Sequence, residues 1–596
     1  MTVKERIARL QENMAAAGVD YYLVPTADYH ESEYVGAHFA VRRFLSGFTG
    51  SAGTMVIGRE EACLWTDGRY FIQAEKQLAG SGITLMKMGT EGTPTVEAYI
   101  VEKMPENGVL GFDGKVINTA MAERLQKKLA DKHVTFHFEE DLVESFFTER
   151  APLSAEPAWV LKPEYAGKSV TEKLADVHQK MEEQGADACI ITSLDDIAWL
   201  YNMRGNDVPD FPIVLSYTIL YLDHAVLFVN EAVLNDELRT VFRENSVEIR
   251  PYMDIYDYVK TMPAKHILLN KNKVNFAITG SLPKEAEIIH GSDPTYLMKA
   301  IKNETEIANT KNAHIKDGVA MVKFIYWLEK NIGKTEITEI SAADYLEARR
   351  REQEGFVELS FGTIAAYNEN AAMMHYSATP ENFAVLAPSG MFLVDSGGHY
   401  LEGTTDITRT FILGEIPEEW KRDYTLTLKG HLALQNAKFL YGCTGLNLDI
   451  LCRGPLWNIG IDYRCGTGHG VGHILNVHEG PNGFRYRMVP ERLDSGVLEA
   501  GMITTDEPGV YTEGSHGVRI ENELLCVKAE KNEYGQFMAF EPITCCPIDK
   551  KGILPELLGP EGIEQLNRYH KMVYEKLSPY FEGEELAWLQ DATAPL

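Results

Sequence analysis

The spacing of apolar and polar residues predicts alternating helices and strands in the first half of the chain. Residues 10–28 and 177–195 share one pattern, which is an amphipathic stretch, a glycine and a short apolar run. The positions that match at one constant offset are Met14 with Met181, Gly18 with Gly185, Asp20 with Asp187, and Asp28 with Asp195. A glycine at that place is typical of a helix C-terminus, so the pattern predicts two copies of a helix–strand unit and a duplicated α/β domain.

Apolar, β-branched runs continue each copy and predict further strands of two sheets. They lie at 53–57 and 62–65 after the first unit, and at 213–222 and 224–229 after the second. Proline-rich punctuation at 151–163 is typical of a linker, and we expect it to separate the two copies.

The second half begins with a helix and then changes character. The apolar positions with helical spacing are Ala308, Ile315, Val319, Val322 and Tyr326. They predict a core-facing helix over 304–330, just after a boundary near 293–302. Residues 356–547 are glycine-rich, with short β-rich runs broken by turns, and a further helix is predicted over 562–577. The expected domains are therefore 1–155, 156–300, 301–547 and a helical extension at 548–596.

Size and charge narrow the class of protein. A chain of 596 residues fits two to four domains. The formal net charge of −30 disfavours nucleic acid and anionic membranes as partners, although it names none. The eight cysteines are scattered without a C-x-x-C pair, and the sequence contains neither an apolar leader nor a run of about 18 apolar residues. We therefore expect reduced thiols and a cytoplasmic location.

Residues that can carry chemistry gather in four segments of the third domain. The sequence contains no H-E-x-x-H, G-x-S-x-G, P-loop or dinucleotide fingerprint. The four segments are 392–411 with Asp395 and Asp406, 466–480 with His469 and His478, 505–511 with Glu507 and Tyr511, and 517–522 with Arg519 and Glu521. Oxygen ligands with one or two imidazoles suit divalent metals, and carboxylates packed together need cations to offset their repulsion. The set suits a pair of ions about 3.5–4 Å apart.

Each segment alone has a plainer interpretation. An aspartate before Ser-Gly-Gly is usually a turn residue, and Arg519 beside Glu521 could form a surface ion pair. His469 and His473 have the spacing of a zinc pair, but His473 has no supporting third ligand. It is the order and spacing of all four segments together that favour a metal site.

The ordered set Asp395, Asp406, His469, Glu507 and Glu521 resembles the metallopeptidase family with the pita-bread catalytic fold. Methionine aminopeptidase, aminopeptidase P, prolidase and creatinase belong to this family. The motifs that carry the resemblance are D-S-G-G, G-T-T-D-I-T-R-T-F, G-T-G-H-G-V-G, N-V-H-E-G-P, D-E-P-G-x-Y and G-V-R-I-E-N, in that order.

The whole chain is similar to the three-domain cytosolic branch of the family, aminopeptidase P. The segments F-L-S-G-F-T-G-S-A-G and L-W-T-D-G-R-Y-F resemble its first domain, and S-L-D-D-I-A-W-L-Y-N resembles its second. The resemblance implies an α/β and α+β fold, in which two related creatinase-like α/β domains precede a pita-bread catalytic domain with a curved antiparallel sheet.

By resemblance, five residues hold two divalent ions. Asp406 and Glu521 bridge the ions, His469 and Glu507 hold one of them, and Asp395 holds the other. Manganese is the first expectation because the set is rich in oxygen, with zinc and cobalt as alternatives. Creatinase-like relatives that work without metal lack the full set, which disfavours a metal-free site.

The resemblance also implies residues on the substrate side. His375 and His478 assist proton transfer and polarise the scissile carbonyl, and Glu507 is the candidate general base. Arg519 and Tyr511 orient the carboxylates and line the substrate pocket, and Phe361 is a candidate for its wall. Cys465 departs from the family, which often has histidine at that place, and this leaves the role of that position open.

These features predict a metal-dependent aminopeptidase that hydrolyses the bond before a penultimate proline, with Xaa-Pro peptides as its partners. Prolidase, which cleaves Xaa-Pro dipeptides, is the alternative. Methionine aminopeptidase lacks two long N-terminal domains, and a peptide-binding relative without catalysis would lack the metal ligands. The resemblance, together with the helix over 562–577 and Trp588, further predicts a homodimer.

Overall fold

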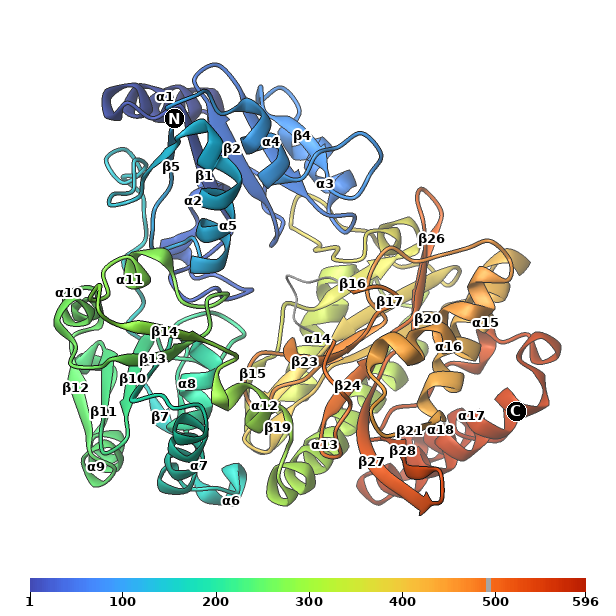
Figure 1. Ribbon diagram of the computed structural model, residues 1–596. Coiled ribbons are helices and arrows are strands. Elements are labelled where there is room, and N and C mark those ends of the chain that lie inside the picture. The colour runs from blue at the N-terminus through green and yellow to red at the C-terminus, as the bar shows by residue number, and fades with distance from the viewer. Residues whose placement is uncertain (489–494) are drawn as a thin grey trace. The chain divides into compact units, whose positions relative to one another are not determined.

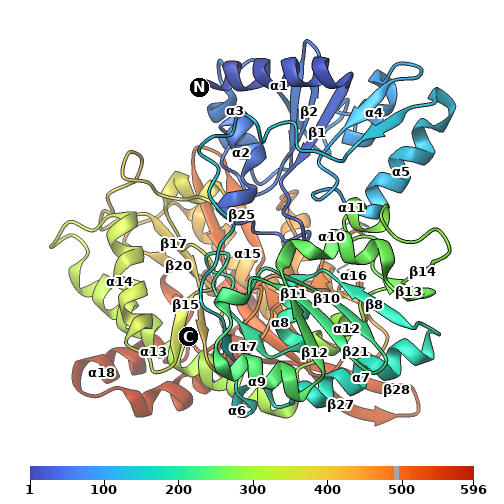
Figure 2. The ribbon, with the colours of Figure 1, turned by 90° about the vertical axis from the view of Figure 1, so that its left-hand side faces the viewer.

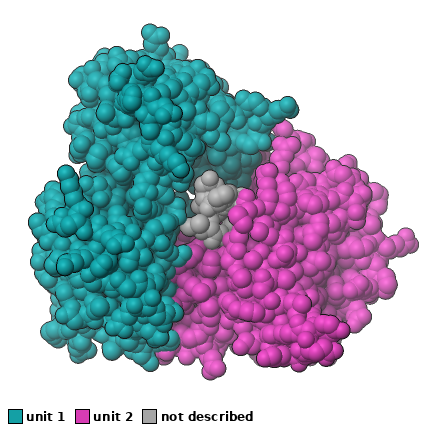
Figure 3. Space-filling view, in the orientation of Figure 1, with its two compact units in different colours: residues 1–161, 168–295 teal, residues 162–167, 296–596 magenta. Residues whose placement is uncertain are grey.

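The computed structural model describes residues 1–488 and 495–596. The chain divides into two compact units, which are residues 1–161 with 168–295, and residues 162–167 with 296–596 (Figure 3). Among the described residues, no disulfide joins any of the cysteines, and no helix combines the length and apolar character needed to cross a bilayer.

The first unit contains two six-stranded mixed sheets with helices packed beside them (Figure 1). The strands of the first sheet are β1 Tyr21–Pro25, β2 Thr54–Gly58, β3 Ala62–Thr66, β4 Thr84–Lys87, β5 Val109–Gly111 and β6 Thr135–His137. Those of the second are β8 Ala188–Ile191, β10 Ser216–Tyr221, β11 Ala225–Val229, β12 Val247–Arg250, β13 His266–Leu269 and β14 Glu287–His290 (Figure 2). The main helices are α1 Val3–Ala17, α2 Val41–Ser46, α3 Phe71–Leu78, α4 Val96–Lys103, α5 Thr119–Leu129, α7 Val170–Glu183, α8 Leu194–Leu200 and α9 Asp236–Glu244.

The two sheets have the same topology, which confirms the predicted duplication. The order β4-β3-β2-β1-β5-β6 corresponds strand for strand to β12-β11-β10-β8-β13-β14. In both sheets the first strand along the chain pairs antiparallel with the second and parallel with the fifth. The strands predicted at 53–57, 62–65, 213–222 and 224–229 are β2, β3, β10 and β11, with ends shifted by a few residues.

The repeated residues have matching structural roles. Met14 and Met181 are fully buried, and Gly18 and Gly185 adopt positive φ of 72° and 69° where their helices end. Asp20 accepts a hydrogen bond from the N–H of Val109, the first residue of β5. Its counterpart Asp187 accepts one from the N–H of the first residue of β13. The repeated residues therefore have the same task in both domains, which is to end the first helix and to connect it to the sheet.

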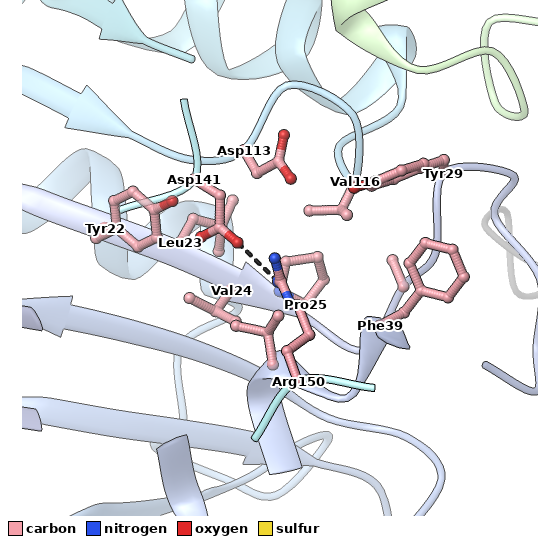
Figure 4. Close-up of a pocket in the computed structure, with 12 residues that line it drawn as sticks. Tyr22, Leu23, Val24, Pro25, Tyr29, Phe39, Asp113, Val116, Asp141 and Arg150 are labelled. Atoms are coloured by element: carbon pink, nitrogen blue, oxygen red, sulfur yellow. Dashed lines mark hydrogen bonds and ion pairs between the residues drawn. The ribbon is translucent and has the colours of Figure 1, made fainter. Parts of the chain in front are cut away.

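A small cavity lies inside the first domain, beside β1 (Figure 4). Leu23, Val24 and Phe39 line its apolar part, and an ion pair of 2.7 Å between Arg150 and Asp141 closes its polar end (Figure 4). Its volume of about 20 Å³ holds little more than one water molecule. It is therefore a packing gap and no substrate site.

The second unit is built on a six-stranded, wholly antiparallel sheet of order β21-β28-β27-β24-β22-β23. Its strands are β21 Lys438–Leu440, β22 Gly468–Gly470, β23 Glu479–Phe484, β24 Ile503–Asp506, β27 Asn522–Asn532 and β28 Gly535–Pro542. Smaller sheets are formed by β15 Phe356–Leu359, β18 Gly398–Tyr400 and β19 Gly403–Thr404, by β16 Ile364–Tyr367, β17 Met391–Ser396 and β20 Ile407–Ile412, and by β25 Gly509–Thr512 and β26 His516–Arg519. This is the curved antiparallel architecture that the sequence predicts.

Helices cover these sheets. They are α13 Glu304–Asn331, α14 Glu339–Arg351, α15 Glu418–Gln435, α16 Gly445–Trp457, α17 Pro555–Leu577 and α18 Gly583–Ala592. The helix predicted over 304–330 is α13, and Val319 and Val322 on it are buried in the core. The helix predicted over 562–577 forms the later part of α17, after a break at Gly559 with φ of 80°. Trp588 packs inward, and its indole N–H donates to Glu329 at 2.6 Å.

Candidate metal centre

Two strands of the second unit present the first two acidic residues. Asp395 lies on β17, opposite Thr408 of β20, and Asp406 directly precedes β20. The antiparallel pairing of β17 with β20 brings both carboxylates to the same end of this strand pair. Both side chains are buried, with 8% and 4% exposure.

Three adjacent strands of the large sheet present the other three residues. His469 lies in β22, Glu507 follows β24, and Glu521 precedes β27. Since β22 pairs with β24 and β24 with β27, the three side chains start from neighbouring strands. The backbone N–H of Glu521 donates to Thr408 at 3.1 Å and so ties the large sheet to β20.

Four of the five side chains converge, and Arg519 links the fifth, Asp395, to them. Donor atoms of Asp406, His469 and Glu521 all lie within 4.8 Å of one another. His469 Nε2 is 3.5 Å from Asp406 Oδ2 and 3.3 Å from Glu507 Oε1. His469 Nδ1 donates to the carbonyl of Gly470 at 2.9 Å, so Nε2 is the ring atom that faces the carboxylates.

Electrostatics at this cluster fits cations. Burial raises the pKa of Asp406 and of Glu521 well above the usual carboxyl range, and repulsion among the carboxylates adds to it. Burial also raises the pKa of Asp395, although Arg519 opposes the shift. Burial opposes the charged forms of His469 and Glu507, but their mutual attraction outweighs it, raising the pKa of His469 to about 9 and lowering that of Glu507.

The donor set therefore suits divalent ions. Asp395 Oδ1 is buried and accepts no hydrogen bond from any described residue, so it is available as a ligand atom. Four carboxylates and one imidazole offer mostly hard oxygen donors. Two divalent charges would offset the repulsion that raises the pKa of Asp406 and Glu521.

Arg519 links several parts of the site. Its Nη2 contacts Asp395 Oδ2 at 2.5 Å, its Nη1 donates to the Tyr511 hydroxyl at 2.8 Å, and its Nε donates to Thr408 Oγ1 at 3.1 Å. Thr408 Oγ1 in turn donates to Glu521 Oε2 at 2.7 Å. One buried guanidinium thus holds two carboxylates in fixed orientations, directly and through a threonine.

Three supporting residues were missed in the sequence. Thr408 contacts Glu521, Thr505 Oγ1 donates to Glu507 Oε1 at 3.1 Å, and Glu523 Oε1 accepts from the N–H of Asp406 at 2.8 Å. Each lies two positions from a predicted ligand in the sequence, and side chains two apart on a strand share a face. That period could have identified them.

A buried network supports the cluster from behind. Arg409 Nη2 donates to Asn522 Oδ1 at 2.9 Å and to the Tyr569 hydroxyl at 2.8 Å. The Tyr569 hydroxyl contacts Asn522 Oδ1 at 3.1 Å. Because Asn522 follows Glu521 and Tyr569 lies on α17, this helix braces the start of β27, next to a predicted ligand.

Two of the remaining predicted residues, His478 and His375, lie beside this cluster or next to a residue that contacts it. The His478 ring packs edge-on against His469 with 4.2 Å between ring centroids. His375 is exposed, and the carbonyl of its neighbour Met374 accepts from Arg519 Nη2 at 3.4 Å. Phe361 is half-buried in the turn between β15 and β16.

The structure also shows what His473 and Cys465 contact. His473 contacts Thr310 Oγ1 and the carbonyl of Tyr165, at 3.2 and 3.1 Å, so it forms no ligand pair with His469. Cys465 packs with Tyr463 and Tyr511, and burial raises the pKa of its thiol to about 11. At this place the chain therefore has a neutral thiol packed among aromatic rings.

Known proteins match the chain from end to end. Residues 6–143 and 149–306 each match the creatinase/prolidase N-terminal domain, residues 308–528 match metallopeptidase family M24, and residues 536–596 match the C-terminal region of that peptidase. A protein of Sordaria macrospora named probable Xaa-Pro aminopeptidase P is 39% identical over 100% of both chains. The chain belongs to the aminopeptidase P group of metallopeptidase family M24.

Other relatives named as aminopeptidase P or X-prolyl aminopeptidase also match the chain over its full length. Aminopeptidase P1 of Arabidopsis thaliana is 38% identical over 100% of this chain and 99% of its own. The solved structure of X-prolyl aminopeptidase from Caenorhabditis elegans, described as a cytosolic enzyme with a di-nuclear active site, superposes with a TM-score of 0.94 at 35% identity over 100% of both chains. An Xaa-Pro dipeptidase from Bacillus anthracis matches only 64% of this chain, at 24% identity and a TM-score of 0.51, and so shares the fold alone.

Proposed function

We propose that the protein is a metal-dependent aminopeptidase that hydrolyses the peptide bond between the N-terminal residue and a penultimate proline. The observation that carries this proposal is the full-length likeness to Xaa-Pro aminopeptidases, in a chain whose acidic residues converge on His469. Turnover of Xaa-Pro-Xaa peptides in the presence of added manganese tests it.

Five residues are assigned to the metals. Asp395, Asp406, His469, Glu507 and Glu521 would together hold two divalent ions. The contacts of His469 with Asp406 and Glu507 support this assignment. Manganese is the proposed metal because four of the five ligands are carboxylates, and zinc and cobalt are the competitors.

When bound, the two ions supply a Lewis acid and a water of lowered pKa. Glu507 accepts the proton of the attacking water, and its contacts with Thr505 and His469 hold it in place. His375 polarises the scissile carbonyl, and His478 assists the transfer of a proton to the departing proline nitrogen. Arg519 keeps Asp395 and Glu521 oriented during this sequence.

Proline selectivity follows from the chemistry of its amide. The bond before proline is a tertiary amide without N–H, so a cleft that requires this N–H fails on it. We assign the proline pocket to the surroundings of His478, Arg519 and Tyr511, with Phe361 as a candidate wall. A peptide with alanine in place of proline leaves that pocket unfilled.

The enzyme should prefer peptides of three or more residues over Xaa-Pro dipeptides. A dipeptidase recognises the free carboxylate of the terminal proline, whereas an aminopeptidase leaves that end open. The two N-terminal domains distinguish this chain from the shorter dipeptidase, which covers 64% of it. We expect a higher kcat/KM for Xaa-Pro-Ala than for Xaa-Pro. A dipeptide favoured about tenfold, which is roughly 1.4 kcal/mol, would instead establish the prolidase alternative.

The protein should form a homodimer and lie in the cytoplasm. The C. elegans relative is described as cytosolic, which supports the location. The family resemblance supports the dimer, whereas α17 and α18 do not, because their apolar side chains pack largely into the protein's own core. Light scattering at micromolar concentration should give twice the chain mass of 66.8 kDa, and a monomer would contradict the dimer.

A further inference from the structure

A buried carboxylate on α14 holds the segment that carries His375. Glu339 is the first residue of α14, and its side chain is fully buried. Its donors are Tyr367 N at 2.7 Å, Asn370 Nδ2 at 2.9 Å, Tyr376 Oη at 2.8 Å and Ala384 N at 2.7 Å. Two donors reach each oxygen, which uses the full acceptor capacity of a carboxylate. All four hydrogen bonds of the carboxylate therefore go to one segment, residues 367–384.

That stretch is fixed at its start, middle and end. It leaves β16 at Tyr367, passes His375, and returns at Ala384. The backbone N–H of Glu339 also donates to the carbonyl of Ala384 at 3.1 Å. Residues 367–384 thus form a loop closed on a single residue.

The other side of the loop rests on the metal centre. A Cβ on Gly517 would lie 1.9 Å from the carbonyl of Ala371, so the loop backbone touches β26 directly. Arg519, on the same strand, contacts the carbonyl of Met374 and the carboxylate of Asp395. The loop is therefore located relative to Asp395 as well as to α14.

His375 lies between two anchored neighbours. Met374 is held by Arg519, and Tyr376 is buried with its hydroxyl on Glu339. The imidazole of His375 itself is exposed. The contacts of the flanking residues help to set the backbone position of His375, and Glu339 provides the one that is remote from the metal ligands.

We propose that Glu339 is a positioning residue that holds the His375 loop in register with the metal centre. The proposal rests on the function assigned to His375 above. A carboxylate is required because glutamine would turn its NH₂ group toward at least one N–H group that can only donate, and would lose at least one hydrogen bond. The N-terminus of α14 and the four donors together offset the buried charge of Glu339.

Glu339→Gln should lower kcat about tenfold or more on Xaa-Pro-Ala, with KM changed less than about threefold, because His375 acts on charge that develops in the transition state. Metal content should remain that of the unaltered protein. Glu347→Gln is the matched control with unchanged kcat, because Glu347 lies on the same helix and, among the described residues, pairs only with Arg351. Tyr376→Phe removes a single donor to Glu339 and is the milder variant to use if Glu339→Gln does not fold. It should lower kcat about two- to fivefold.

A double-mutant cycle separates positioning from general destabilisation. In a His375→Ala background, Glu339→Gln should lower kcat less than about twofold. A tenfold drop that persists in that background, or normal kcat of Glu339→Gln, overturns the proposal.

Hydrogen exchange tests the anchoring without activity. Residues 367–384 should exchange faster in Glu339→Gln than in Glu347→Gln, and equal exchange overturns the proposal. If the unaltered protein cleaves no Xaa-Pro peptide, the proposed function fails, and the exchange result still decides whether Glu339 anchors the loop.

Discussion

Glu507→Gln is expected to lower kcat by about two to four orders of magnitude, the range that general-base catalysis contributes. The amide keeps the size and one oxygen of the carboxylate but cannot accept the proton of the attacking water. Thr505 Oγ1, which donates to Glu507 Oε1 at 3.1 Å, can still hold the amide oxygen, so the change is local. Initial rates on Xaa-Pro-Ala, measured together with metal content, check this result.

The control for that variant is Glu513→Gln, because Glu513 is an exposed glutamate in the neighbouring turn between β25 and β26. It should turn over normally. If Glu507→Gln retains two ions and near-normal kcat, Glu507 has no part in the proton transfer. If it loses its metal, the comparison is repeated at saturating manganese.

Asp406→Ala should reduce bound manganese from two ions per chain and abolish activity. Asp406 is assigned to both ions and lies 3.5 Å from His469 Nε2, so its loss removes a shared ligand. Elemental analysis of protein loaded with manganese and then desalted measures the stoichiometry. Asp344→Asn, an exposed position on α14, is the control. Two ions retained by Asp406→Ala would contradict the assignment.

The same variant should have opposite effects on stability with and without metal. In the metal-free protein, burial and repulsion raise the pKa of Asp406 and of Glu521. An acid whose folded pKa is raised destabilises the fold as pH rises above the ordinary carboxyl value, near 4. At pH 7, Asp406→Ala should therefore raise the Tm of metal-free protein and lower the Tm of manganese-loaded protein. A fall in both would show that Asp406 is needed for packing.

The fold was largely predictable because its signals are local. The helix over α13 and the glycines at 18 and 185 follow from spacing and from backbone conformation within a few residues. Asp20 and Asp187 also stand out as a pair, although the strand starts that they contact lie far along the sequence. The part of α17 that lies before Gly559 was not predicted, and the helix predicted over 562–577 begins after that break.

The proposed metal ligands and the residues that hold them differ in how well they can be predicted from the sequence. The five proposed ligands stand in compact motifs, and Thr408, Thr505 and Glu523 follow from the strand period. Glu339 could not have been found, because its donors lie 28 to 45 positions away and join it only through tertiary packing. A lone glutamate at a helix start predicts no more than a favourable interaction with the helix N-terminus.

The contact between Tyr569 on α17 and Asn522 on β27 has a consequence for biosynthesis. Asp395 is made early in the catalytic unit, Glu521 late, and the helix that braces Glu521 later still. While the ribosome is still synthesising the strands of the large sheet, the five side chains cannot be near one another. The strand start that carries Glu521 gains its brace only after α17 has emerged and docked. A complete site would then be loaded with metal after release from the ribosome and not during translation.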